Sequence, residues 1–174
     1  TVTNNLYYKK NGISLLKSRD ALKTEEPFLL SMADHIFSDD FFSEFIKRSS
    51  PFINSSSAVL SVDKNINDVF DLDDATKVLI KGHNIVKIGK DLNLYNAIDT
   101  GLFLCSHSIF GFLERAYLSS GDVSISDGMK ALAESNRFFA ADMTGYLWQD
   151  VDTPEMKKEA EKRLTENKTR KNNS

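Results

Sequence analysis

Short apolar runs alternate with amphipathic helical patterns along most of the chain. PFLLSM (27–32), AVLSVD (58–63) and NAIDTGLFLCS (96–106) each have the length and residue content of a buried strand. The segments between these runs carry apolar residues at helical spacing instead. This alternation predicts an α/β fold with helices on both faces of a sheet.

Several segments combine helical spacing with start or stop signals. Residues 41–46 present one apolar face after a cap at Ser38 or Asp39, and SSPFINSSS (49–57) is expected to end that helix. The last segment begins at Thr153, with proline at the first helical position. The expected helical segments are residues 12–23, 41–46, 106–120, 124–135 and 153–164.

Two further segments predict strands without having one continuous apolar run. ATKVLIKGHNIVKIGK (75–90) alternates apolar and polar residues about a central KGHN, in which Gly82 allows the positive φ of a tight turn. RFFAADMTGYLWQDV (137–151) is typical of two short strands that meet at residues 143–145. The inserted β-hairpin makes the predicted sheet mixed rather than purely parallel.

The composition is that of a soluble globular protein. The 174 residues are 41% hydrophobic and 27% charged, which suits one compact domain. The net charge of −3 gives no basis for general nucleic-acid binding. No apolar run reaches membrane-spanning length, and no secretory signal pattern is present. A single cysteine, Cys105, excludes an internal disulfide, so a cytoplasmic protein is expected.

The ends of the chain suggest a piece of a longer protein. The sequence starts at Thr1, without an initiator methionine, in a stretch that resembles the middle of a domain. It stops in a polar and basic run that resembles a linker. We therefore expect a domain over residues 1–164 and a polar basic tail or linker over residues 165–174.

Carboxylates follow two of the predicted strands. In open α/β sheets, ligands bind beyond the carboxyl ends of the strands. Asp34 follows one strand, while Asp150 and Asp152 follow another. If those strand ends are neighbours, the carboxylates share a cleft and offer the hard oxygen ligands that Mg²⁺ accepts. The alternative is that these aspartates only start helices, which is the commoner role of an aspartate at such a position.

Other reactive side chains give weaker signals. Lys77 and Lys90, on the predicted hairpin, could neutralise a phosphate, or they could be ordinary solvated lysines. The three histidines are too scattered, and too unaccompanied by cysteine, for a zinc site. Cys105 lies within an apolar run and is best explained as a core residue. The sequence has neither a nucleophile elbow nor a glycine-rich phosphate loop.

Taken in order, several segments resemble the inositol-1-phosphate cytidylyltransferases, which are sugar-phosphate nucleotidyltransferases. The resemblance extends from about residue 11 to residue 164, and it is specific as a set rather than through any one segment. It implies a Rossmann-like three-layer mixed sheet of the nucleotide-diphospho-sugar transferase type. The segments are GISLL, FLLSMADHIFS, VFDLDDATKV, VKIGKDLNLYNAIDTGLFLCS, SISDGMKAL and WQDVDTPE.

The resemblance implies an activity and a set of site residues. The activity is transfer of CMP from CTP to inositol-1-phosphate, which yields CDP-inositol and pyrophosphate with Mg²⁺ as cofactor. Asp34 matches the metal-binding and catalytic aspartate, and either Asp150 or Asp152 matches the second metal ligand. Lys90 matches the catalytic lysine that grips the acceptor's phosphate. The remaining matches are Thr76, Lys77, Asp99, Thr100 and Gly101 on the acceptor side, and Gly12 and Ser14 where the nucleotide base is held.

The sequence also departs from the family pattern. The family begins with a strand and a glycine-rich loop that embraces the triphosphate, and nothing here matches it, so an N-terminally truncated fold is expected. In the family, a membrane-embedded CDP-alcohol transferase often follows the domain, and the basic tail lies where that junction would be. His35 is assigned a supporting role. Two alternatives stay open: a nucleotidyltransferase for another sugar, polyol or choline phosphate, and a non-catalytic truncated module.

Overall fold

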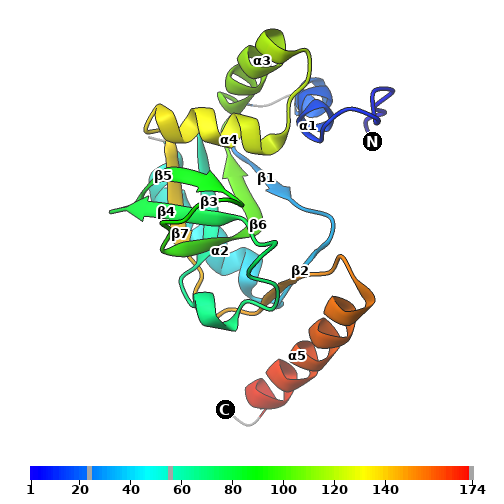
Figure 1. Ribbon diagram of the computed structural model, residues 1–174, viewed down its shortest axis with the longest axis vertical. Helices are drawn as coiled ribbons and strands as arrows, with labels where there is room; N and C mark the ends of the chain where they lie inside the picture. The colour runs from blue at the N-terminus through cyan, green and yellow to red at the C-terminus, as the bar shows by residue number, and fades with distance from the viewer. Residues whose placement is uncertain (23–24, 55–56, 173–174) are drawn as a thin grey trace.

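The computed structural model describes residues 1–22, 25–54 and 57–172. A six-stranded mixed sheet with the strand order β1-β6-β3-β7-β5-β4 forms its centre (Figure 1). Strands β2 and β8 form a separate two-stranded ribbon. The strands are β1 (Phe28–Ser31), β2 (His35–Phe37), β3 (Ala58–Asp63), β4 (Lys77–Lys81), β5 (Asn84–Gly89), β6 (Ala97–Cys105), β7 (Phe138–Asp142) and β8 (Trp148–Asp150).

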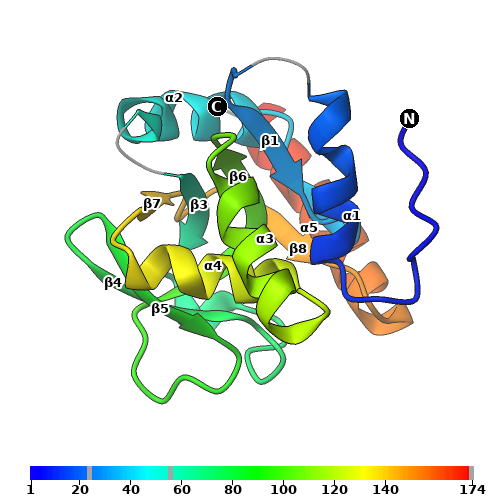
Figure 2. The same cartoon turned by 90° about the horizontal axis from the view of Figure 1, so that it is seen from above.

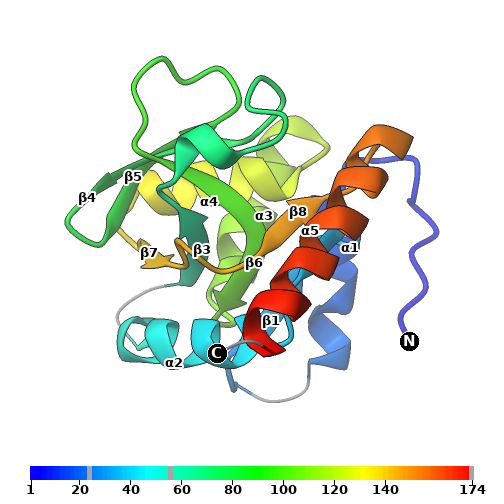
Figure 3. The same cartoon turned by 90° about the horizontal axis from the view of Figure 1, so that it is seen from below.

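Helices cover both faces of the sheet, as the sequence predicts. Figure 2 shows α1, α3 and α4 on one face, and Figure 3 shows α2 and α5 on the opposite side. No helix in the described ranges is both long and apolar enough to cross a bilayer. The helices are α1 (Gly12–Ser18), α2 (Phe41–Ile53), α3 (Ile109–Ser120), α4 (Ile125–Glu134) and α5 (Pro154–Asn172), with 3₁₀ turns η1 (Arg19–Ala21) and η2 (Ile66–Asp68).

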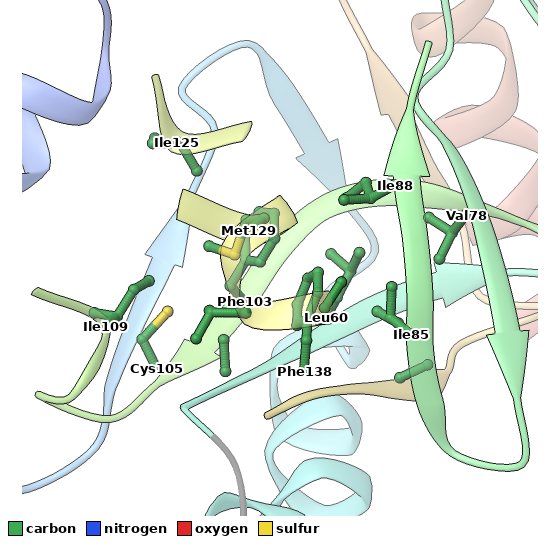
Figure 4. Packing of buried hydrophobic residues seen from close by; sticks show 14 of the residues in the cluster. Leu60, Val78, Ile85, Ile88, Phe103, Cys105, Ile109, Ile125, Met129 and Phe138 are labelled. Atoms are coloured by element: carbon green, nitrogen blue, oxygen red, sulfur yellow. The ribbon is translucent and has the colours of Figure 1, made fainter. Parts of the chain in front are cut away.

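Two apolar clusters hold these layers together. In the larger one, Leu60, Phe103 and Phe138 of the sheet pack with Met129 of α4 (Figure 4). In the smaller one, Phe41 and other residues of α2 pack on the opposite face of the same strands. Strand β3 is buried along its whole length because it has helices on both sides. This is why it reads as a continuous apolar run in the sequence.

Strand directions bring several chain segments to one edge of the sheet. Strand β6 is antiparallel to both β1 and β3, and β3 is parallel to β7. The carboxyl ends of β1, β3 and β7 therefore meet the beginning of β6. The pairing of β3 with β6 shifts register between Leu60 and Val62, opposite Gly101, whose φ is 80°. Beyond this irregularity, the start of β6 also pairs with β4.

The ribbon of β2 and β8 was not expected from the sequence. The sequence predicts a second strand within residues 137–151, which is β8, but it predicts no strand over residues 35–37, which pair with β8 in antiparallel fashion. The main-chain N–H of Val151 donates to the carbonyl of Asp34 at 2.8 Å and extends the ribbon. The ribbon thus ties the segment after β1 to the segment after β7.

Two expectations for the first half of the chain were wrong in detail. Strand β1 is an edge strand rather than a buried one, because its only partner among the described strands is β6. Helix α2 ends within SSPFINSSS, as expected, but it is longer than residues 41–46: it continues through Pro51 to Ile53, since Phe45, Ser49 and Ile53 bury one stripe at helical spacing. Residues 55 and 56 of that segment lie outside the described ranges.

The start of α2 also differs from the prediction. Asp40 occupies the N-cap position, in place of Ser38 or Asp39. Ser38 is buried, and its carbonyl accepts a hydrogen bond from the N–H of Phe41. Phe42 and Ile46, which were expected on the buried face, are among the exposed apolar side chains. Residues four apart lie on the same side of a helix, so Phe41 and Phe45 form one stripe while Phe42 and Ile46 form another. Only the stripe of Phe41 and Phe45 is buried.

The hairpin and the later helices match the prediction closely. The β4–β5 turn uses Gly82 with φ 62°. Helix α4 begins with a capping box between Ser124 and Asp127. Helix α5 begins after Thr153, whose Oγ1 accepts from the N–H of Met156. The helix continues to Asn172, so residues 165–172 of the expected tail are helical, while residues 173 and 174 lie outside the described ranges.

Candidate active site

A cavity of about 290 Å³ opens at the edge where these strand ends meet. The starts of β2 and β6, the end of β8, the loop before β4, and α4 all contribute to its lining. This is the position at which open α/β sheets bind ligands. The structure therefore gathers most of the predicted site residues: Asp34, Thr76, Lys90, Asp99, Gly101, Asp150 and Asp152 all line the cavity.

Asp34 is held at the junction of β1 and β2. Its backbone carbonyl is fixed by Val151, and its Oδ1 lies 2.7 Å from Nδ1 of His35. About half of the Asp34 side chain is exposed, whereas His35 is only 16% exposed. The carboxylate thus faces the cavity while its partner is anchored in the wall.

Asp150 approaches Asp34 through the ribbon. In the β2–β8 register, Asp150 lies directly opposite His35. Its Oδ1 accepts a hydrogen bond from Nε2 of Gln149 at 3.0 Å. Burial raises the pKa of Asp150, and the neighbouring His35 partly offsets that effect. Asp152, two residues on, is exposed where the chain turns into α5.

These carboxylates do not by themselves enclose a metal. Among residues 1–22, 25–54 and 57–172, no three His, Cys, Asp or Glu side chains are grouped closely enough to hold an ion. Mg²⁺ commonly takes one or two protein carboxylates and completes its shell with water and substrate phosphates. Asp34, together with Asp150 or Asp152, fits such an open donor set.

Asp99, near the start of β6, lines the same cavity. Its Oδ1 accepts from the N–H of Gly101 at 2.7 Å. Burial raises the pKa of the Asp99 carboxyl to about 6, although the Gly101 N–H and the nearby His35 act in the opposite direction. We call the group formed by Asp34, His35, Asp99 and Asp150 the carboxylate wall.

Lys90 faces the cavity from the end of β5. Its Nζ forms an ion pair with Oδ1 of Asp74 at 2.6 Å, and both side chains are more than half exposed. The loop that carries Asp74 also supplies Thr76, whose carbonyl accepts from the N–H of Asp99 at 2.9 Å. We call Lys90, Asp74 and Thr76 the lysine wall. This wall adds one exposed cation to the cavity that the carboxylates also line.

Two predicted acceptor-side residues lie outside the cavity lining. Nζ of Lys77 donates to the carbonyls of Asp73 and Ala75, at 3.2 and 3.3 Å, and so supports the loop from behind. Thr100 is fully buried and bonds to the side chain and carbonyl of Ser61. The structure therefore places both residues in contact with the backbone that shapes the site.

The two predicted base-binding residues also lie outside this lining. A Cβ at Gly12 would fall 2.6 Å from the carbonyl oxygen of Val123, so the absence of a side chain allows α1 to approach the start of α4. Ser14 is exposed, and its Oγ accepts from Nδ2 of Asn4 at 2.9 Å. Their neighbour Asn11 does line the cavity, and its Oδ1 accepts from the N–H of Ile125.

The sequence interpretation missed two side chains that shape the cavity. Trp148 stacks on His35 with ring planes 11° apart, and its indole N–H donates to Oδ2 of Asp63 at 2.8 Å. Asp74 holds Lys90. Both lie inside segments that carried the family resemblance, VFDLDDATKV and WQDVDTPE. Only the three-dimensional contacts distinguish them from their neighbours.

The fold and the position of the cavity define the class: this is a nucleotidyltransferase fold of the nucleotide-diphospho-sugar transferase type. A putative glucose-1-phosphate thymidylyltransferase from Bacillus anthracis aligns with a TM-score of 0.70 over 94% of this chain and 63% of its own, at 16% identity. An apo UDP-glucose pyrophosphorylase aligns with a TM-score of 0.69 over 92% and 61%, also at 16% identity. These two likenesses concern the fold alone.

Within that class, some proteins are more similar to this chain in sequence. The inositol-1-phosphate CTP transferase from T. maritima has a TM-score of 0.75 and 26% identity, over 91% of this chain and 62% of its own. Proteins named bifunctional IPC transferase and DIPP synthase are similar in sequence. Those of Aquifex aeolicus and Thermococcus kodakarensis are 32% and 35% identical over 156 and 157 residues, which are 90% of this chain.

These similarities confirm the resemblance to inositol-1-phosphate cytidylyltransferases that the sequence suggests. The chain spans 33% of the length of each of those two bifunctional relatives, so it corresponds to one part of them. No protein-family model matches the chain.

Proposed function

We propose that this chain carries the cytidylyltransferase activity of its protein, transferring CMP from CTP to inositol-1-phosphate. The products are CDP-inositol and pyrophosphate. The observation that carries the proposal is one cavity lined by Asp34, Asp99 and Asp150 together with Lys90, in a fold shared with an inositol-1-phosphate CTP transferase. Carboxylates on one side and a lysine on the other suit a reaction between two phosphorylated substrates.

The lysine wall binds the acceptor in this proposal. Lys90 exchanges its exposed partner Asp74 for the phosphate of inositol-1-phosphate, which it holds as a point charge. An oxygen of that phosphate attacks the α-phosphorus of CTP. A new P–O bond forms as the bond to the bridging oxygen breaks, and pyrophosphate leaves with the electron pair. Because the nucleophile is already anionic, the reaction needs positioning and charge neutralisation rather than a general base.

The carboxylate wall, apart from Asp99, orients the nucleotide side. Asp34, with Asp150 or Asp152, would hold Mg²⁺. When bound, this ion neutralises charge that develops on the triphosphate. Asp99 offers its second carboxylate oxygen to a hydroxyl of the acceptor, while Thr76 borders the same space. Lys77, Thr100 and Gly101 shape the backbone around the acceptor, and Gly12 and Ser14 remain our candidates for the base-binding side.

The wider setting follows from the same proposal. The substrates are small phosphorylated molecules rather than nucleic acid, and the reaction takes place in the cytoplasm. The relatives' names pair an IPC transferase with a DIPP synthase in one protein. We propose that CDP-inositol formed here is passed to a membrane-embedded CDP-alcohol transferase beyond the C-terminal end of this chain.

The direct test is a product assay on the full-length protein with CTP, inositol-1-phosphate and Mg²⁺. Formation of CDP-inositol with equimolar pyrophosphate supports the proposal. A panel of other nucleotides and of choline, sugar and polyol phosphates measures selectivity. Faster turnover of another acceptor would replace inositol-1-phosphate in the proposal. Absence of turnover with every pair would favour a non-catalytic module.

A further inference from the structure

His35 occupies the centre of the carboxylate wall, although the mechanism above gives it no chemical step. Its ring contacts Asp34 through Nδ1 at 2.7 Å and faces Asp150 across the ribbon. It also interacts electrostatically with Asp99. An ionised carboxylate only accepts hydrogen bonds, so the bond to Asp34 places a proton on Nδ1.

The ring is fixed in place on several sides. An ideal Cβ at Gly101 would lie 2.4 Å from Cδ2 and 2.7 Å from Nε2 of His35, so the ring occupies the space that a side chain there would fill. Trp148 stacks on the ring with a centroid distance of 6.3 Å, and Phe37 lies at the same centroid distance. The indole N–H of Trp148 donates a hydrogen bond to the buried Asp63, which holds Trp148 in place. Trp148 in turn leaves the His35 ring little freedom to turn.

We propose that His35 is a positioning residue whose Nδ1–H fixes the rotamer of Asp34, and that Gly101 is glycine in order to seat the His35 ring. The inference rests on the proposed function for its consequence in catalysis, but the geometry concerns the metal-side carboxylate itself. Outer-shell partners that orient a ligating carboxylate have a large influence on metal affinity and activity. In this arrangement Gly101 acts through the imidazole rather than by touching substrate.

Two substitutions at His35 separate hydrogen bonding from packing. His35→Phe keeps a ring between Gly101 and Trp148 but removes the donor. His35→Asn loses the ring but keeps an amide N–H at about the position of Nδ1. In the full-length protein, we expect His35→Phe to lower kcat and to weaken Mn²⁺ binding by about 10- to 100-fold. We expect His35→Asn to recover most of both losses, with the KM for the acceptor nearly unchanged in each variant.

Gly101→Ala tests whether the His35 ring needs the space that a side chain at position 101 would fill. Gly121 has a similar φ of 73°, against 80° at Gly101, but no atom lies within 4 Å of its ideal Cβ. Gly121→Ala therefore reports the cost of backbone strain alone. We expect Gly101→Ala to reproduce the losses of His35→Phe, while Gly121→Ala leaves kcat and Mn²⁺ affinity unchanged. The double variant of Gly101→Ala with His35→Phe should be no worse than the poorer single variant.

Titration of Mn²⁺ alone, followed by electron paramagnetic resonance, keeps this test independent of the transfer reaction. If no CMP transfer occurs with any acceptor but Mn²⁺ affinity follows the expected order, the proposed function fails and the positioning role stands. Losses in His35→Asn, with normal kcat and Mn²⁺ affinity in His35→Phe, would reduce His35 to a packing residue. Mn²⁺ affinity that is insensitive to Asp34→Ala, or to His35→Phe in a variant with normal melting temperature, would overturn the inference.

Discussion

The two walls of the cavity are held in different ways. The carboxylate wall is fixed by the β2–β8 ribbon, by the backbone N–H of Gly101 that donates to Asp99, and by the stacking of His35 on Trp148, whose indole N–H is bonded to Asp63. In the lysine wall, the charged side chain of Lys90 is held by an ion pair with Asp74, and both side chains are exposed. An exposed pair of this kind contributes about 0–1 kcal/mol, so exchanging its partner costs little.

This difference matches the two tasks in the proposed reaction. Charge that develops at the α-phosphate is best neutralised by groups whose positions are set before the substrate arrives. The acceptor's phosphate, by contrast, has to be recruited from water, and a flexible ammonium group suits that role. We therefore expect changes at Asp34 or Asp150 of the carboxylate wall to affect turnover, and changes at Lys90 of the lysine wall to affect acceptor binding.

The largest effect should come from Asp34. Asp34→Ala removes the carboxylate that is common to both proposed metal-ligand pairs, and we expect kcat for CDP-inositol formation to fall by about 10²- to 10³-fold or more. A pyrophosphate-release assay measures the change. Asp39→Ala, at an exposed position five residues away that lies outside the cavity lining, is the matched control and should leave kcat unchanged. Near-normal kcat in Asp34→Ala would contradict the metal assignment.

The next largest effect should distinguish Asp150 from Asp152. Asp150 is half-buried and faces His35 across the ribbon, whereas Asp152 is exposed at the approach to α5. We expect Asp150→Asn to lower kcat by about 10²-fold and Asp152→Asn by clearly less, because a preorganised ligand contributes more. Comparison of kcat at saturating Mg²⁺ decides between them. The opposite order would make Asp152 the second metal ligand.

Lys90→Ala tests the other wall. Loss of the ammonium group should raise the KM for inositol-1-phosphate by about 10-fold or more, since a charge-assisted contact is worth about 1.5–3 kcal/mol. The KM for CTP should change little. Lys87→Ala removes an exposed lysine from the same strand and serves as the control. If the KM for CTP rose while that for the acceptor did not, Lys90 would belong to the nucleotide side.

The central strands and helices were predictable because their signals are local. The continuous apolar run of β3, the alternation about Gly82 and the capping residues of α4 each specify structure within a few residues of sequence. Strand β8 was predicted within residues 137–151, but the ribbon was not, since β2 has only three residues and pairs with β8 because distant segments meet. Helix α2 passes Pro51 for a similar reason: tertiary burial of its stripe outweighs the local break.

The candidate site was also predictable only in part. Asp34, Asp99 and Asp150 lie next to strand ends, where the general rule for α/β sheets and the family resemblance both direct attention. The contacts that orient them were not predictable. The stacking of Trp148 on His35 and the fit of the ring against Gly101 join three separate strands, and no spacing within one segment reveals them.

A smaller effect concerns the pH dependence of stability. Burial raises the pKa of Asp99 to about 6, so the folded protein keeps a proton between about pH 4 and 6 that the unfolded chain releases. The folded state binds more protons in that range, and this contribution to stability is lost as the pH rises through about 6. Asp99→Asn removes the effect. Its stability relative to the natural protein should increase from pH 4 to pH 7 by about 1–3 kcal/mol.

Urea unfolding at a series of pH values measures this difference. Asp91→Asn, at an exposed position in the loop after β5, should show no such trend relative to the natural protein. A pH-independent difference for Asp99→Asn would mean that the Asp99 carboxyl is better solvated than the folded structure indicates. The carboxylate wall would then be less preorganised than the comparison of the two walls assumes.

The smallest effect should follow loss of Lys77. Its ammonium group donates to the carbonyls of Asp73 and Ala75, so it braces the loop that presents Asp74 and Thr76. Lys77→Met keeps the aliphatic stem but removes both hydrogen bonds. We expect the KM for inositol-1-phosphate to rise about two- to fivefold and the stability to fall by about 1 kcal/mol, with kcat nearly unchanged. Steady-state kinetics and urea unfolding measure both quantities. A loss in kcat as large as that of Asp34→Ala would place Lys77 in contact with the reacting phosphates, and the lysine wall would no longer be confined to binding the acceptor.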